Sequence, residues 1–291
     1  MQNRPIIDTT RHDTTRHDTH PHAQESPDVK ILIACHKKCD VPSDPIYFPV
    51  HVGAEGKLSI GFTPDNTGDN ISAKNPMYCE MTGLYWAWKN LSCDYIGLVH
   101  YSRFFSRRAK FGTASIDDAL TGDDVRGLLS QHKIILPRRR KYYIETIYSH
   151  YAHTADGTHL DIARRIISGT CPEYLPAFDT VMSRTWANML NMFIMPKSLA
   201  DEYCSWVFPV LKGVEDNADR SGLNSYQTRF VGMVSEMMLD VWLDRMIETG
   251  RIQPGDIAEI PYVYTRKINW PRKVTSFLMA KFFGVKYKRN F

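Results

Sequence analysis

The feature that most constrains the fold is a set of short apolar runs, each ending at polar or basic residues. The runs VKILIAC at 29–35, YIGLV at 95–99 and KIIL at 133–136 are rich in β-branched residues. Runs of this length between polar segments predict buried strands. A fourth run, MLNMFIM at 189–195, predicts a strand ended by Pro196.

Segments with helical spacing of apolar residues separate these runs. We expect helices over 76–90, 117–130, 158–167 and 172–183, and two longer amphipathic ones around 199–211 and 226–242. One more strand is expected at 58–62, within a long loop region from 40 to 75. Strands alternating with helices predict an α/β fold, with a Rossmann-type layered sheet and flanking helices.

Composition narrows the class of protein. The 291 residues fit a single domain, and a net charge of +4 is too small to argue for nucleic acid as a partner. The six cysteines form no C-x-x-C pair, so a zinc site is poorly supported and reduced thiols are expected. No apolar run reaches the roughly 20 residues that span a bilayer, and no signal segment is visible. We therefore expect a cytoplasmic protein.

Three regions are expected along the chain. Residues 1–28, with a tandem TTRHD repeat and few apolar side chains, predict a disordered tail. Residues 29–266 form the expected folded domain. Residues 267–291 mix basic and aromatic side chains, which suits peripheral attachment to an anionic membrane on its inner face or a packed helix with a solvated basic end.

Several motifs carry a resemblance to a known family. They are GDNISAKNPMYCEMTGLYWAWKN at 68–90, DYIGLVHYSRFF at 94–105, VKILIACHK with HVGA, RRKYYIETIYSHY, NMFIMPKSLADEYCSWVFPVL and VGMVSEMMLDVW. Together they cover roughly residues 29–245. The chain resembles bacterial glycosyltransferases of capsular or exopolysaccharide biosynthesis, a family first described as a domain of unknown function.

The resemblance implies a GT-A-like fold and a hexosyltransferase. It implies a UDP-sugar donor, with galactose in pyranose or furanose form as the suggested sugar. The implied acceptor is a lipid-linked or polymeric glycan. One departure is visible: where the family has two arginines after the histidine and tyrosine, this chain has Ser102 and then Arg103.

The expected strand ends carry the candidate catalytic groups. Many GT-A enzymes hold a metal ion with a D-x-D motif, but this chain has none and carries His100, Tyr101, Ser102 and Arg103 in its place. Cationic side chains, first Arg103, are expected to take over some of the metal's work, so no cofactor is required. A manganese or magnesium ion held by His100 and a remote carboxylate stays open, as does a surface ion-pair role for Arg103.

Glu236 is the expected catalytic base, at the S-E position of the resemblance. The helical spacing puts it opposite the apolar stripe of its own helix. That position suits a glutamate facing a cleft, and equally a solvated one. Asp179 and Glu145 are lesser candidates.

The donor is expected to contact residues in the first third of the chain. They are His36, Lys37, His51, Gly53, Asp69, Asn70, Lys74 and Tyr101. Asp69 and Asn70 are also good turn formers, and a lone histidine such as His51 is often structural.

A basic and aromatic cluster at 138–151 is expected to contact phosphate or acceptor. Its members are Arg139, Lys141, Tyr142, Tyr148 and His150. A solvated basic loop remains the alternative, and His150 with His153 could also be read as metal ligands. Aromatic faces suit sugar rings, which favours an acceptor-stacking loop.

Two other classes of function compete with a transferase. One is a non-catalytic glycan-binding or assembly subunit of a polysaccharide complex. The other is a phosphate-binding hydrolase or phosphotransferase, which the absence of a P-loop weakens.

Overall fold

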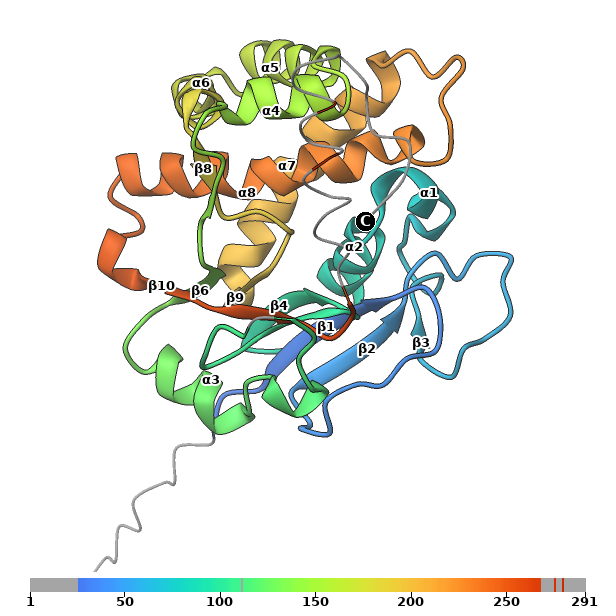
Figure 1. The fold of residues 1–291 in the computed structure, drawn as a ribbon, viewed down its shortest axis with the longest axis vertical. Helices are drawn as coiled ribbons and strands as arrows, with labels where there is room; N and C mark the ends of the chain where they lie inside the picture. The colour runs from blue at the N-terminus through green and yellow to red at the C-terminus, as the bar shows by residue number, and fades with distance from the viewer. Residues whose placement is uncertain (1–25, 111, 268–274, 276–278, 280–291) are drawn as a thin grey trace, which may run out of the picture.

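A computed structural model describes residues 26–110, 112–267, 275 and 279. The expected tail at 1–28 and the segment at 267–291 therefore lie almost entirely outside the described residues. In the described part, a sheet of nine strands forms the base of the molecule (Figure 1). Its order is β10-β6-β9-β4-β1-β2-β3, with β5 and β11 attached beside β4.

The strands have the following bounds: β1 Val29–Cys35, β2 Tyr47–His51, β3 Thr63–Pro64, β4 Tyr95–His100, β5 Arg103–Phe105, β6 Ile134–Pro137, β9 Phe193–Pro196, β10 Ile257–Ile260 and β11 Tyr262–Tyr264. A separate small sheet pairs β7 Arg140–Lys141 with β8 Trp186–Ala187. Strand β1 is parallel to β2 and β4, whereas β9 is antiparallel to both β4 and β6. The carboxyl ends of β1, β4 and β6 therefore lie at one edge of the sheet.

Most helices cover one side of the sheet, and α3 Gly122–Leu129 lies on the other side (Figure 1). The other helices are α1 Asn75–Tyr78, α2 Met81–Asn90, α4 Ile147–Thr154, α5 Thr158–Thr170, α6 Leu175–Ser183, α7 Lys197–Asn217 and α8 Phe230–Glu248. Helices α2 and α7 contact the strands, α8 packs on α7 and α6, and α3 contacts β6. Short 3-10 helices complete the chain: η1 Ser72–Lys74, η2 Ile116–Asp118, η3 Pro172–Tyr174, η4 Gln227–Arg229 and η5 Pro254–Asp256.

Both faces of the sheet are buried, which explains why its strands read as continuous apolar runs. In β1, Leu32 and Ala34 belong to the core beneath the helices, whereas Ile31 and Ile33 belong to the core on the opposite face. The expected single α/β domain with a layered sheet is confirmed.

Three local expectations are wrong. No strand forms at 58–62, where the backbone turns at Gly56 and Gly61 and Leu58 is 91% exposed. The helix expected over 76–90 is broken at Cys79, whose φ is +54°. The strand expected from 189 begins only at Phe193.

Other boundaries also move. The segment at 147–154, expected as a loop, is helix α4, and Thr146 caps it by accepting a hydrogen bond from the Ser149 amide. The expected helix at 117–130 is the 3-10 helix η2 followed by α3. Among the described residues, no helix is both long and apolar enough to cross a membrane.

A buried carboxylate organises the loop region after β2. Asp65 has no exposed surface and accepts hydrogen bonds from the backbone amides of Gly53 and Ala54, at 2.8 and 3.0 Å. It also accepts from the hydroxyls of Ser72 and Thr82. One side chain thereby ties the loop to η1 and α2.

Asp65→Asn should lower the free energy of unfolding by about 2–3 kcal/mol, because the amide nitrogen cannot accept the bonds that one carboxylate oxygen accepts. Urea unfolding followed by circular dichroism measures this. The matched control is Asp69→Asn in the same region, where the side chain is exposed, and its effect should stay within about 0.5 kcal/mol. Equal effects of the two substitutions would contradict the role given to Asp65.

Candidate active site

A cavity of about 970 Å³ opens where the carboxyl ends of β1 and β4 face helix α8. That volume is at the upper end of the about 300–1,000 Å³ usual for ligand sites. Among the described residues, its walls carry five cationic side chains, three histidines and two carboxylates: Arg103, Arg140, Arg229, Arg266, Lys267, His36, His100, His150, Glu80 and Glu236. The excess of positive charge suits an anionic ligand.

The turn between β4 and β5 presents two of these groups. Residues His100 and Arg103 pair across it, so both project from the tip of β4. The Ser102 backbone amide donates to Nδ1 of His100 at 3.3 Å, and the Ser102 hydroxyl lies 2.9 Å from the same atom. With Nδ1 held as an acceptor, the proton of a neutral imidazole resides on Nε2.

His100 stays neutral across the physiological range. Burial lowers its pKa to about 2, and the positive charge of Arg103 adds to that effect. A neutral ring with a proton on Nε2 is a hydrogen-bond donor that carries no charge of its own.

This strand tip fits a metal ion poorly. The Nδ1 atom of His100 is already used, and Arg103, Arg229 and Arg266 surround the ring with positive charge. In the described ranges, no group of three or more His, Cys, Asp or Glu side chains is placed to hold a metal ion. The cations themselves are the groups available to neutralise a bound anion.

Tyr101 joins the tip of β1 to the segment after β11. Its ring meets His36 edge-on at 4.8 Å, and its hydroxyl accepts a hydrogen bond from Arg266 at 3.0 Å. The Arg266 guanidinium also lies over the Tyr101 ring, 4.6 Å from the centroid. These contacts fix a cation and an imidazole on one wall of the cavity.

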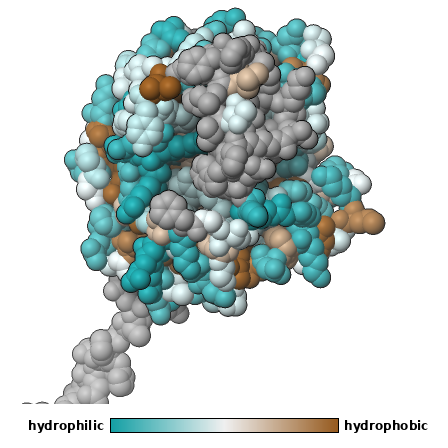
Figure 2. Space-filling model, viewed as in Figure 1, coloured by the Kyte–Doolittle hydropathy of each residue, from teal (hydrophilic) through white to brown (hydrophobic). Residues whose placement is uncertain are grey.

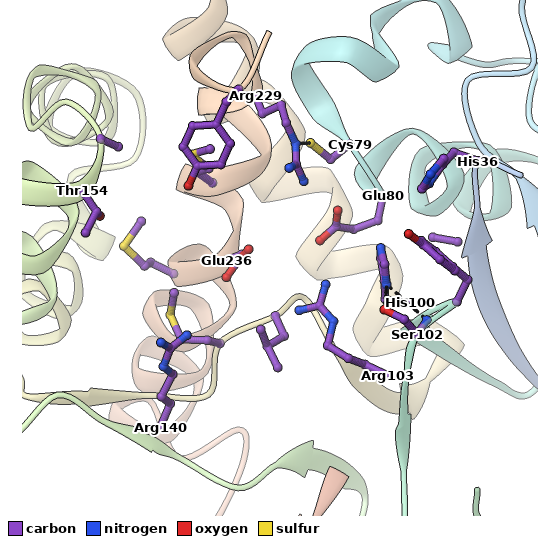
Figure 3. A pocket seen from close by; sticks show the side chains of 18 of the residues that line it. His36, Cys79, Glu80, His100, Ser102, Arg103, Arg140, Thr154, Arg229 and Glu236 are labelled. Carbon is purple, nitrogen blue, oxygen red and sulfur yellow. Dashed lines mark hydrogen bonds between the residues drawn. The ribbon is translucent and has the colours of Figure 1, made fainter. Parts of the chain in front are cut away.

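Glu236 faces the cavity from α8. Figure 3 shows its carboxylate pointing toward that of Glu80, with Arg103 and Arg229 beside the pair. Burial raises the pKa of Glu236 above its usual range, and Glu80 raises it further, whereas Arg103, Arg140 and Arg229 oppose the shift. A carboxylate with a raised pKa is a stronger proton acceptor, as a catalytic base requires.

The opposite wall comes from β7 and α4. Arg140 and Tyr142 line the cavity with His150, whose Nδ1 lies 2.9 Å from the buried carboxylate of Glu145. Glu145 also contacts His153 at 2.7 Å. Burial acts to raise the pKa of Glu145, but its hydrogen bonds to the two histidines lower it overall. Glu145 therefore positions His150 rather than facing the cavity itself.

Seven of the residues predicted from sequence line this cavity: His36, His100, Tyr101, Arg103, Tyr142, His150 and Glu236. Nine others lie outside its walls: Lys37, His51, Gly53, Asp69, Asn70, Lys74, Arg139, Lys141 and Tyr148. Of the expected donor contacts, His36 therefore lies in one cavity with Arg103, whereas Asp69 does not.

Several of the excluded residues have other partners. The Lys74 ammonium pairs with Glu215 at 2.7 Å, and the Arg139 guanidinium pairs with Glu259 and lies over the Trp186 ring. Asp69 accepts a hydrogen bond from the Tyr85 hydroxyl.

Tyr148 donates to Asp161 on α5, and His51 is buried in β2. Asp179, weighed as a lesser base, forms a bidentate pair with Arg164 on an exposed surface. None of these contacts involves the cavity.

Gly53 does not line the cavity but packs closely against a residue that does. Its φ is +64°, and a Cβ there would come within 2.5 Å of the Asn75 side chain. Asn75 does line the cavity. A glycine at 53 is therefore needed for the backbone to approach a wall residue closely.

Sequence reasoning missed Glu80, Arg140, Arg229 and Arg266. Alternation along β7 could have found Arg140, because Arg140 and Tyr142 share one side of an extended segment whereas Arg139 and Lys141 share the other. No local sequence pattern indicates that Glu80, Arg229 and Arg266 line the cavity, because tertiary contacts bring them there.

Figure 2 shows the same face of the molecule as Figure 1. Hydrophilic side chains predominate on it, and hydrophobic ones are scattered along its edges rather than gathered in one patch.

Comparison with known proteins places the fold and the family. A solved structure, described as "WbbM bifunctional glycosytransferase apo structure", matches with a TM-score of 0.76 and 27% sequence identity over 82% of this chain. The match covers 46% of that longer chain, so this chain spans about half its length. The fold is therefore the GT-A-like fold expected from the sequence.

No curated protein matches the chain. A family model described as a domain of unknown function, DUF4422, matches residues 30–247 and so includes both strand tips and Glu236. The chain belongs to the DUF4422 family.

Proposed function

We propose that this protein is a glycosyltransferase that moves a hexosyl group from a UDP-sugar to a growing glycan. The observation that carries the proposal is the cationic cavity at the tips of β1 and β4, with two carboxylates facing the same space. A nucleoside diphosphate leaving group needs the cations, and an acceptor hydroxyl needs a base. Similarity to part of a bifunctional glycosyltransferase supports the same class of reaction.

The cavity residues divide naturally between the two tasks. Arg103 and Arg229 line the cavity, and in this proposal they bind the diphosphate and stabilise the negative charge that develops as it leaves. His100 supplies an uncharged donor from Nε2. Glu236 takes the proton of the acceptor hydroxyl, and its raised pKa suits that step.

The sugar and the product follow from the family resemblance. We propose galactose, in pyranose or furanose form, as the transferred sugar. The proposed product is a capsule, exopolysaccharide or lipopolysaccharide glycan, made in the cytoplasm and on the inner face of the membrane. The proposed partners are a lipid-linked or polymeric glycan as acceptor and an anionic membrane surface.

Calorimetry and thermal shift with a panel of nucleotide sugars test the proposal. UDP and UDP-galactose should both stabilise the protein, by about 2.7 kcal/mol at a hundredfold excess over the dissociation constant. Slow release of UDP from UDP-galactose without acceptor identifies a transferase, whereas a glycan-binding subunit would bind and release nothing. Absence of both binding and hydrolysis across the panel would exclude the proposed function.

Chelation should have little effect on activity. Because cations rather than a D-x-D motif surround the proposed diphosphate position, EDTA should change UDP release by less than about twofold. Added manganese should restore nothing further. Loss of activity in EDTA with recovery in manganese would show that a metal ion does the work assigned here to arginine.

A further inference from the structure

Three of the four non-glycine residues with positive φ in the described ranges gather around Glu80. Cys79 immediately precedes it, with φ +54° and ψ −131°, and breaks what would otherwise be one helix from α1 to α2. Leu190 and Asn191, with φ +88° and +51°, lie on the segment before β9. Each such position costs of order 1–3 kcal/mol and persists only where the surroundings impose it.

Hydrogen bonds hold both Asn191 and Cys79, and one of them reaches the Glu80 carboxylate. The Asn191 side-chain amide donates to Oε1 of Glu80 at 3.1 Å and to the Ser235 hydroxyl at 2.9 Å. The Ser235 hydroxyl donates onward to the Gly232 carbonyl at 2.7 Å. The thiol of Cys79 accepts a hydrogen bond from Arg229 at 3.1 Å. The Glu80 carboxylate is thus oriented by Asn191 at the cavity wall, and Arg229 holds the preceding residue, Cys79.

Charge decides what such a carboxylate can face. A fixed negative charge would repel a diphosphate, so the phosphates belong with the arginines. A carboxylate instead accepts hydrogen bonds from the neutral donors of a nucleotide sugar, which are the uracil N–H, the ribose hydroxyls and the hydroxyls of the transferred sugar. Glu236 faces the same space, and the acceptor hydroxyl is assigned to it. Because the Glu80 carboxylate lies beside that of Glu236, the donor group nearest to it is the transferred sugar, which reacts there, rather than the ribose or the uracil.

We propose that Glu80 determines donor specificity by accepting hydrogen bonds from hydroxyl groups of the transferred sugar, with Asn191 as its positioning residue. This inference rests on the proposed function, because it requires a nucleotide-sugar donor in the cavity. Glu80 then binds the sugar, and Glu236 acts as the base.

Calorimetric titration with UDP and with UDP-galactose separates the sugar contact from the nucleotide contacts. Glu80→Gln should weaken UDP-galactose binding on the order of tenfold and leave UDP binding within about twofold, because only the sugar contacts the carboxylate. Asn191→Gly keeps the left-handed backbone, which glycine adopts readily, and should weaken UDP-galactose binding in the same direction. Glu173→Gln, an exposed charge on η3, is the matched control and should change neither.

The pH dependence of the rate of UDP release is a further measurement on Glu80→Gln, and it should not change if Glu80 has only a structural role. The groups facing Glu236 are Glu80, Arg103, Arg140, Arg229, Cys79, Tyr142, Tyr151 and Tyr226. Of these, Glu80 is the carboxylate, and removing its charge lowers the pKa of Glu236. The fall in rate at acidic pH should therefore move to lower pH in Glu80→Gln.

The outcomes are distinct. Wild-type protein that binds neither UDP nor UDP-galactose overturns the proposed function and this inference with it. Wild-type binding with equal losses for UDP and UDP-galactose in Glu80→Gln, or with no loss, overturns the inference alone.

Discussion

Glu236→Gln should lower the rate of sugar transfer by about 10²–10⁴-fold, which is the usual contribution of a general base. The amide is close in size to the carboxylate but cannot take the proton of the acceptor hydroxyl. UDP binding should stay within about twofold, because the arginines and His100 remain. Steady-state rates with saturating UDP-galactose, together with calorimetry of UDP, measure the two effects separately.

The wild-type pH profile gives a second view of the same residue. Burial and Glu80 raise the pKa of Glu236. As the pH is lowered, Glu236 should therefore become protonated, and activity should be lost, at a higher pH than an ordinary glutamate would give. Glu248→Gln, an exposed position on the same helix, is the control and should leave the rate unchanged. A rate in Glu236→Gln within tenfold of wild type would remove Glu236 from the role of base.

Arg103→Ala should weaken binding of UDP and UDP-galactose by about 30- to 150-fold, or about 2–3 kcal/mol. The guanidinium projects from the β4–β5 turn into the cavity, where it is assigned to the diphosphate. Arg103→Lys keeps the charge but loses the fork-shaped donor set, so its loss should be intermediate. Calorimetric titration of each variant gives the dissociation constants.

A matched control removes an arginine from a different surface. Arg165 is exposed on α5, away from the cavity, and Arg165→Ala should leave UDP binding unchanged. Similar losses for Arg103→Ala and Arg165→Ala would mean that general positive charge, rather than a contact at the turn, attracts the nucleotide. Unchanged binding in Arg103→Ala would remove that residue from the phosphate site.

The sequence predicts four of the nine strands of the sheet, β1, β4, β6 and β9, because an apolar run is a local signal, whereas the other five were not predicted as strands. An apolar run shows where a strand ends, and parallel strands bring their carboxyl ends to one edge. These two features were enough to place His36, His100 and Arg103 around one cavity. Neither the residue at which an apolar run ends nor the direction of two parallel strands depends on distant side chains.

The remaining wall residues depend on partners far along the chain. Lys74 was expected at the donor, but Glu215 on α7, 141 residues away, pairs with it. Glu80 was missed because the spacing at 76–90 reads as one helix. The helix is interrupted at Cys79, whose thiol accepts a hydrogen bond from Arg229, 150 residues away. No local sequence pattern predicts this interruption.

The last strand sets the order in which the cavity can be completed. Strand β11 pairs with β5, and Arg266 just beyond it contacts Tyr101 across 165 residues. During synthesis the amino-terminal part folds first, and contacts between distant segments wait for the later one to emerge. A chain that ends before β11 has no partner for β5 and no Arg266, so the wall formed by Tyr101 and Arg266 cannot be completed until this last segment has been made.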